Sequence, residues 1–222
     1  MRAQYPLVFS TLLIRLAVGV AIVHILTSLG SDTIVPDWFI AILGIGSIGT
    51  GIVLSMMHLG RPKRFLNSFA NPKSMLTLEA YFIPPLLVCM AFLGAGYFFD
   101  QMAWLNVVGK IGTVVFGVIL IFVTAKVYHL KARPTWATPL VVYEFFLSTI
   151  CLGLLGYVGL VPFFGQMVGT GLLYLTGFAM IVLAVEFIIT IYTGIIFKAC
   201  HKRQPKCCGT HRQKSNSIPG SA

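Results

Sequence analysis

Long apolar stretches separated by short polar segments run through almost the whole chain. Six of them are long enough for the roughly 20 residues that a membrane-spanning helix needs. The last is long enough to tilt, or to leave the bilayer as a helix. The pattern predicts an all-α, polytopic membrane bundle of about six transmembrane helices, near residues 8–29, 37–57, 78–98, 104–128, 138–160 and 168–198.

The predicted helices follow one another without an obvious linker or internal repeat. We therefore expect residues 1–199 to form one integral-membrane bundle. Residues 200–222 are basic and then rich in Ser, Gly and Pro, which predicts a poorly ordered tail. Cys200, Cys207 and Cys208 in this tail lack the paired Cys-x-x-Cys spacing of a structural zinc site, so we expect no metal there.

Composition and charge support this assignment. Hydrophobic residues make up 57% of the 222 residues and charged residues 10%, whereas a soluble domain carries roughly 25% charged residues. The net charge of +10 follows the predicted topology: basic residues cluster at one end of the helices, and Asp32, Asp37 and Asp100 lie in the opposite loops. This alternation indicates an even number of spans with both termini on one side, the cytoplasmic side by the positive-inside rule. It accounts for the basic charge without a nucleic-acid partner.

The most informative polar segment lies between the second and third predicted helices. His58 begins it, Arg61 and Arg64 follow, and Glu79 stands at the start of the next helix. An imidazole can accept a hydroxyl proton and release it to water near neutral pH, and a nearby carboxylate can orient it or take a second proton. Quinol oxidation needs such a pair, because two protons must leave with two electrons. The alternative is a capping histidine and a helix N-terminal carboxylate, each satisfied locally.

Other ionisable residues fall within or at the edge of the predicted helices, where burial without a partner is costly. Arg15 and Glu144 lie at similar depths from the basic side and are expected to pair between helices. Lys110 is expected to extend toward water on the acidic-loop side. Glu186 lies deeper, and a role in a proton path stays open for it.

Small residues are concentrated in the second predicted helix. Gly44, Gly46, Gly49 and Gly51 predict a face that packs closely against a neighbouring helix, with a glycine-lined cofactor crevice as the alternative. Pro84 and Pro85 predict a bend in the third helix, which would either widen a cavity or serve packing.

The histidines do not form a convincing haem site. A b-type haem needs facing axial ligands on neighbouring helices, yet His24 lies toward the opposite side from His58 and His129. There is also no cysteine array for an iron–sulfur cluster. We therefore expect neither haem nor iron–sulfur cluster in this chain.

Two motifs resemble the membrane anchor subunit family of dimethyl sulfoxide reductase. The first is Ser55-Met56-Met57-His58-Leu59-Gly60-Arg61-Pro62, followed by Asn67-Ser68 and Leu78-Glu79. The second is Lys126-Val127-Tyr128, followed by Pro134-Thr135-Trp136 and Leu152-Gly153-Leu154-Leu155-Gly156. The resemblance covers roughly residues 8–160. That family commonly has eight spans, whereas six are predicted here.

The resemblance implies a function in anaerobic respiration at the bacterial inner membrane. The chain would bind and oxidise menaquinol through His58 and Glu79. Electrons would pass to an iron–sulfur subunit and then to a molybdopterin catalytic subunit, neither of which this chain contains. It would therefore be the quinol-oxidising subunit of an oxidoreductase complex, without activity of its own toward the terminal acceptor.

The quinol site is expected to include residues beside this pair. Arg61 and Arg64 would fix the loop, favour anionic intermediates or dock the partner. Phe65 and Tyr81 would flank the ring, with apolar walls supplying most of the binding. Two alternatives stay open: a small six-helix transporter or channel, and a purely structural membrane tether. The transporter lacks the paired broken helices that its class favours.

Overall fold

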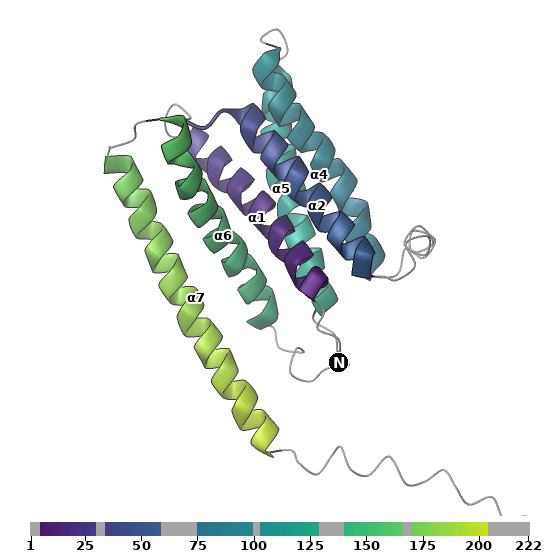
Figure 1. Cartoon of the computed structure of the whole chain (residues 1–222), viewed down its shortest axis with the longest axis vertical. Helices are drawn as coiled ribbons and strands as arrows, with labels where there is room; N and C mark the ends of the chain where they lie inside the picture. Colours follow the sequence, from purple (N-terminus) through teal and green to yellow (C-terminus); the bar gives the residue numbers. More distant parts are fainter. Residues whose placement is uncertain are drawn as a thin grey trace, which may run out of the picture.

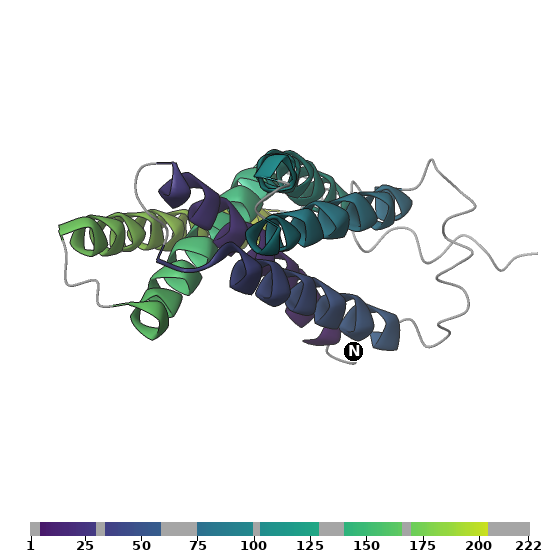
Figure 2. The same ribbon diagram turned by 90° about the horizontal axis from the view of Figure 1, so that it is seen from above.

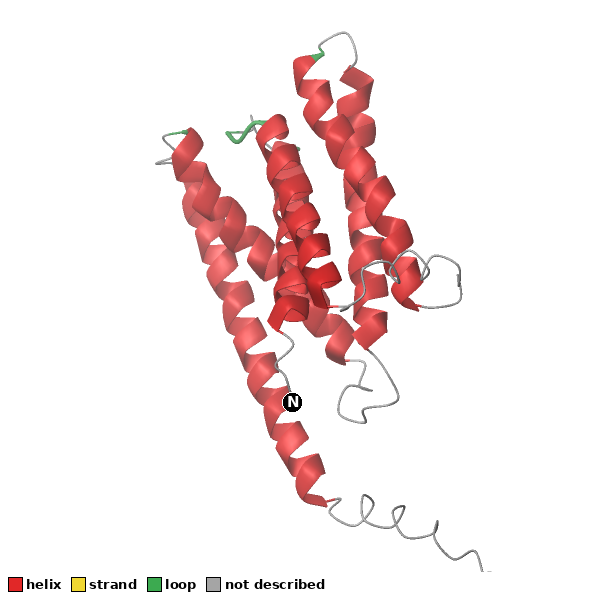
Figure 3. Cartoon of the chain, turned by 45° about the vertical axis from the view of Figure 1, so that its right-hand side comes forward, coloured by secondary structure: helices red, strands yellow, loops and turns green. Residues whose placement is uncertain are grey.

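The computed structural model of the chain describes the backbone of residues 5–29, 34–58, 75–99, 103–128, 140–165 and 170–203. Every regular element in these ranges is an α-helix (Figure 3). Each helix holds an apolar segment long enough to cross a membrane, which confirms the predicted all-α membrane bundle. The helices are α1 (Tyr5–Ser28), α2 (Asp37–His58), α4 (Met75–Phe98), α5 (Ala103–Tyr128), α6 (Leu140–Phe164) and α7 (Thr170–Arg203).

Consecutive helices run up and down, so their connections alternate between the two ends of the bundle (Figure 1). α1 packs against α2, α5 and α6, while α4 packs against α2 and α5. α7 packs mainly on α6 and lies at the edge of the assembly (Figure 2). It reaches Arg203, past the boundary at 199 expected from the sequence. The rest of the predicted tail lies outside the described residues.

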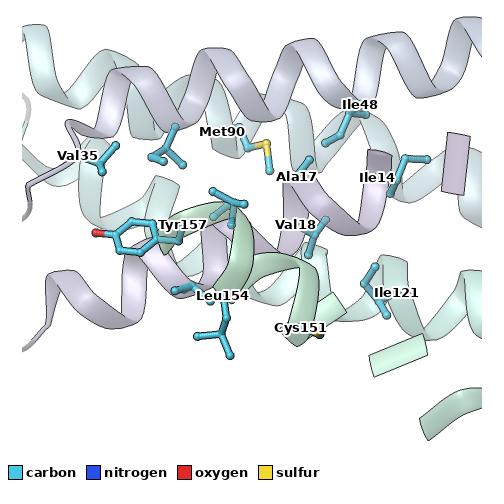
Figure 4. Close-up of a cluster of buried hydrophobic side chains, with 14 of the residues drawn as sticks. Ile14, Ala17, Val18, Val35, Ile48, Met90, Ile121, Cys151, Leu154 and Tyr157 are labelled. Carbon is cyan, nitrogen blue, oxygen red and sulfur yellow. The ribbon is translucent and has the colours of Figure 1, made fainter. Parts of the chain in front are cut away.

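The central helix α1 is much more buried than the peripheral helix α7. In α1, 61% of the apolar window is buried inside the protein, against 11% in α7. The core is built from aliphatic side chains of α1, α2, α4, α5 and α6, including Val18, Ile48, Met90 and Ile121 (Figure 4). The exposed apolar side chains of α7 suit contact with lipid, because lipid tails are as apolar as a protein core.

A close backbone approach joins α1 and α6 through two glycines. A Cβ atom added at Gly153 would overlap the backbone of Gly19, and one added at Gly19 would overlap the carbonyl oxygen of Thr149. Helices this close need residues without side chains at the crossing. Gly153 belongs to the second motif that we identified in the sequence, and its role here is packing.

The glycine face predicted on α2 is only half right. A Cβ atom at Gly44 would meet Met90 Sδ at 2.8 Å, and one at Gly51 would meet the Ser10 carbonyl oxygen at 3.1 Å. At Gly46 and Gly49 it would meet no atom of the described residues within 4 Å. Residues on one helical face recur every three to four positions, so Gly44 and Gly51 share the face that packs, whereas Gly46 and Gly49 lie on the opposite face.

We expect Gly153→Ala to destabilise the chain, because the added methyl group forces α1 and α6 apart. Overpacking of this kind costs about 1–3 kcal/mol. The matched control is Gly159→Ala in the same helix, where the methyl group would enter open space. This variant should not be destabilised, because Ala has a higher helix propensity than Gly. Unfolding of the purified chain by SDS titration in detergent micelles measures both. Equal free energies of unfolding for the two variants would contradict the close approach.

Candidate functional site

Glu79 stands near the start of α4, at the end of the bundle where α2 ends (Figure 1). Its side chain is partly buried and faces α5. Thr124 of α5 donates a hydrogen bond from Oγ1 to Glu79 Oε1 over 2.9 Å, and Thr124 is itself buried. Within the described residues, this carboxyl group therefore has a neutral hydroxyl as its hydrogen-bond partner.

His58 is the last residue of α2, which packs against α4. Because the two helices run in opposite directions, the backbone of His58 lies at the same end of the bundle as Glu79 (Figure 1). The side chain of His58, and the whole of Arg61, Arg64 and Phe65, fall outside the described residues. A contact between the imidazole and the carboxyl group stays a prediction.

Tyr81 lies two positions beyond Glu79 and is 45% exposed. Residues two apart on an α-helix point about 200° apart around its axis. Tyr81 therefore faces the outside of the bundle, whereas Glu79 faces Thr124. A quinol ring that touched both side chains would have to reach around the edge of α4, and the role of Tyr81 stays a prediction.

A second polar centre lies at the opposite end of the bundle, around Asp37. This residue begins α2, where the helix dipole favours a negative charge. Its Oδ1 is 2.5 Å from His24 Nε2 of α1. Its Oδ2 accepts a hydrogen bond from Asn106 Nδ2 of α5 at 2.6 Å and lies 3.5 Å from Lys110 Nζ. Asn106 Nδ2 also donates to the carbonyl of Leu93 in α4 at 3.3 Å. The centre thus connects four helices.

His24 is fully buried in this centre. Its ring lies 5.9 Å from that of Tyr157 in α6, at an angle of 47°. The Tyr157 hydroxyl accepts a hydrogen bond from Thr27 Oγ1 at 3.1 Å. His24 Nδ1 has no hydrogen-bond partner among the described residues. A fifth helix, α6, is therefore in contact with the centre through the packing of two rings.

The centre around Asp37 was not foreseen from the sequence. The charge pattern groups Asp37 with the loop charges, although the predicted helix 37–57 begins at this residue, and Lys110 is expected to extend toward water. In the structure Asp37 is the first residue of α2, and Lys110 turns toward it. The sequence did contain one indication of this centre. His24 and Asp37 flank the short connection between the first two predicted helices, and Lys110 lies toward the same end of the predicted bundle.

Arg15 joins α1 to α6 near the Glu79 end. Its Nη1 donates to Ser148 Oγ at 2.7 Å, and its guanidinium carbon lies 4.4 Å from the centre of the Phe145 ring. Ser148 and Phe145 are on α6, the helix that carries Glu144. The ion pair between Arg15 and Glu144 stays a prediction.

A cavity of about 480 Å³ opens between α5 and α6, lined by Phe122, Lys126, Val142, Tyr143 and Phe146. Three of its five lining residues are aromatic, and the hollow is open to the outside rather than enclosed. Thr124 lies on the other face of α5, turned toward Glu79. The cavity is therefore separate from the site around Glu79.

Metal ligands do not gather in the described ranges: no three His, Cys, Asp or Glu side chains there are placed to share an ion. Cys89 and Cys151 are buried free thiols within α4 and α6.

Comparison with known proteins links most of the chain to one family. The family model described as "DMSO reductase anchor subunit (DmsC)" matches residues 1–208. A polypeptide of the anaerobic dimethyl sulfoxide reductase of Haemophilus influenzae is 29% identical over 171 residues, which covers 72% of this protein and 59% of that relative. The protein thus spans less than two thirds of the length of the curated relative that it matches. No solved structure matches it.

We expect Asp37→Ala to lower the free energy of unfolding by about 3–5 kcal/mol, the usual cost of removing one partner from a buried ion pair. The reason is that Lys110, Asn106 and His24 would all lose their shared acceptor. SDS titration of the purified chain in micelles measures the effect. Lys110→Met should also destabilise it, but less, because Lys110 is partly exposed.

Lys126→Met is the matched control, since this lysine lies in the same helix but near its other end and is exposed. It should leave the free energy of unfolding within about 0.5 kcal/mol of the parent, as surface substitutions do. A result in which Lys110→Met and Lys126→Met behave alike would remove Lys110 from the centre.

Proposed function

Because the chain belongs to the DMSO reductase anchor subunit family, we propose that it holds a reductase complex on the bacterial inner membrane and oxidises menaquinol there. The electrons pass to an iron–sulfur subunit and from it to a molybdopterin catalytic subunit. The six apolar helices make it a multi-pass membrane protein. In this proposal both termini are on one side of the membrane, the cytoplasmic side by the positive-inside rule.

The observation that carries this proposal is the position of Glu79. Its carboxyl group is partly buried at one end of the bundle, next to the end of the helix that His58 terminates. Ionisable side chains in membrane helices are rare and commonly mark a proton or substrate path. A reductant dissolved in the lipid can reach this depth, and a proton released there has a short way to water.

The proposed reaction converts quinol to quinone, two protons and two electrons. His58 accepts a hydroxyl proton and passes it to water, as an imidazole can near neutral pH. Glu79 orients the imidazole or takes the second proton. Arg61 and Arg64 fix the loop or dock the partner, and Phe65 and Tyr81 flank the ring. The two electrons leave for the iron–sulfur subunit.

Two alternatives compete with this proposal. A purely structural tether would hold the soluble subunits without touching quinol, and Glu79 would then be a locally satisfied helix-end carboxylate. A six-helix transporter would need binding groups near the middle of the membrane, formed by interrupted helices. α4 is continuous through Pro84 and Pro85, which gives the transporter little support.

The test is quinol oxidation by the assembled, membrane-bound complex. His58→Ala and Glu79→Gln should each slow the reduction of the iron–sulfur partner by a quinol analogue about 100-fold or more, because general acid–base groups contribute about 10²–10⁴ in rate. Direct reduction of the partner by dithionite should be unchanged, since it bypasses the membrane subunit.

Glu144→Gln is the matched control. It makes the same chemical change in a second partly buried glutamate, on α6, and should leave quinol oxidation near the parent rate. If His58→Ala and Glu79→Gln also retained the parent rate and affinity for the analogue, the tether would be the better description.

A further inference from the structure

Most of the Ser and Thr hydroxyl groups of the described helices follow one rule. Nine of them donate to a backbone carbonyl three or four residues earlier in their own helix, as Ser and Thr in helices commonly do. These nine belong to Thr11, Thr27, Ser28, Thr50, Ser148, Thr149, Thr176, Thr190 and Thr193. The hydroxyl is thereby satisfied within the helix.

Thr124 departs from that rule. Its hydroxyl donates across to α4, to Glu79 Oε1 at 2.9 Å. Thr124 is 2% exposed, so water does not compete for this hydrogen bond. A hydroxyl in such a place gives up the carbonyl of its own helix for a carboxyl group on another. This interhelical hydrogen bond ends at the one carboxyl group to which we assign a proton-exchange role.

A hydroxyl group suits a carboxyl group that changes its protonation state. It is a donor and an acceptor at once, and its hydrogen can rotate. It donates to the ionised carboxylate, and it can accept from the protonated acid after a rotation about one bond. A lysine or an amide nitrogen in its place would donate only, and would favour one of the two states.

We propose that Thr124 is a positioning residue for quinol oxidation: its hydroxyl holds Glu79 in one orientation in both protonation states. The proton moves between the quinol side and Glu79, while Thr124 gains and loses none. This inference rests on the function proposed above for Glu79. It adds a residue of α5 to His58 of α2 and Glu79 of α4.

The assembled complex provides the test. Thr124→Val keeps the shape of the side chain and removes the hydroxyl. It should lower kcat for quinol-analogue oxidation about tenfold, the usual effect of losing one hydrogen bond to a charged group. KM should change little, because Thr124 does not touch the quinol in this proposal. Thr124→Ser restores the hydroxyl and should recover most of kcat.

The chain contains a matched control on the same helix. Thr113 is fully buried, and its Oγ1 has no hydrogen-bond partner among the described residues. Thr113→Val makes the same chemical change and should leave kcat and KM unaltered. A tenfold loss in both variants would show a general effect of packing in α5, and would overturn the role of Thr124.

Infrared difference spectroscopy gives a readout that does not depend on turnover. The carbonyl stretch of protonated Glu79 is identified by its loss in Glu79→Gln. In Thr124→Val this band should move to higher frequency, because the acid has lost its hydrogen-bond partner. An unmoved band, or full kcat in Thr124→Val while Glu79→Gln is inactive, would overturn the inference and leave the proposed function standing. Full activity in Glu79→Gln would reject the proposed function itself.

Discussion

Compensation of the buried carboxylate of Asp37 is the constraint on which the arrangement of the helices depends. A charge in an apolar bundle is tolerated when it is paired and hydrogen-bonded. The carboxylate of Asp37 contacts His24 of α1 and both Asn106 and Lys110 of α5. Asn106 also reaches the carbonyl of Leu93 in α4. The polar contacts fix the α1–α2 hairpin against the α4–α5 hairpin at one end. Packing then brings the end of α2 and the start of α4 together at the other.

The two buried carboxylates face different electrostatic surroundings. Asp37 has a lysine, an imidazole and an amide around it, so its negative charge is compensated and its place is structural. Glu79 has, within the described residues, the neutral hydroxyl of Thr124. Gain of a proton at Asp37 would abolish its attraction to Lys110. Gain of a proton at Glu79 breaks no ion pair that the described residues form, so this carboxyl group is the better suited to repeated proton exchange.

The fold could be predicted from the sequence because a membrane helix must be long and apolar throughout, and that property is local. The interhelical partners could not, because they depend on how helices rotate about their axes. The sequence places Asp37 at a helix start but does not name its interhelical partners. It also does not show that Gly46 and Gly49 lie on a face that contacts none of the described residues. Glu79 was identified from its motif, but Thr124 lies 45 residues away on another helix, and no spacing in the sequence connects the two. The side chain of His58 and the arginines that follow it lie outside the described residues, so the other half of the predicted site rests on its motif.

The positions of the polar contacts also bear on the end of the bundle at which the proposed reaction would release its protons. Between the centre around Asp37 and the site around Glu79, the interior is filled largely by aliphatic side chains such as Val18, Leu120 and Ile121, each at most 1% exposed. A proton crosses such a layer poorly, because an uncompensated charge there is far from water. An anchor that oxidises quinol at one end and releases its protons at the same end has no need to cross that layer. A transporter would have to open a path through this aliphatic layer. The separation of the two polar ends therefore fits the proposed one-sided proton release, in which Glu79 would serve the reaction while Asp37 stabilises the bundle.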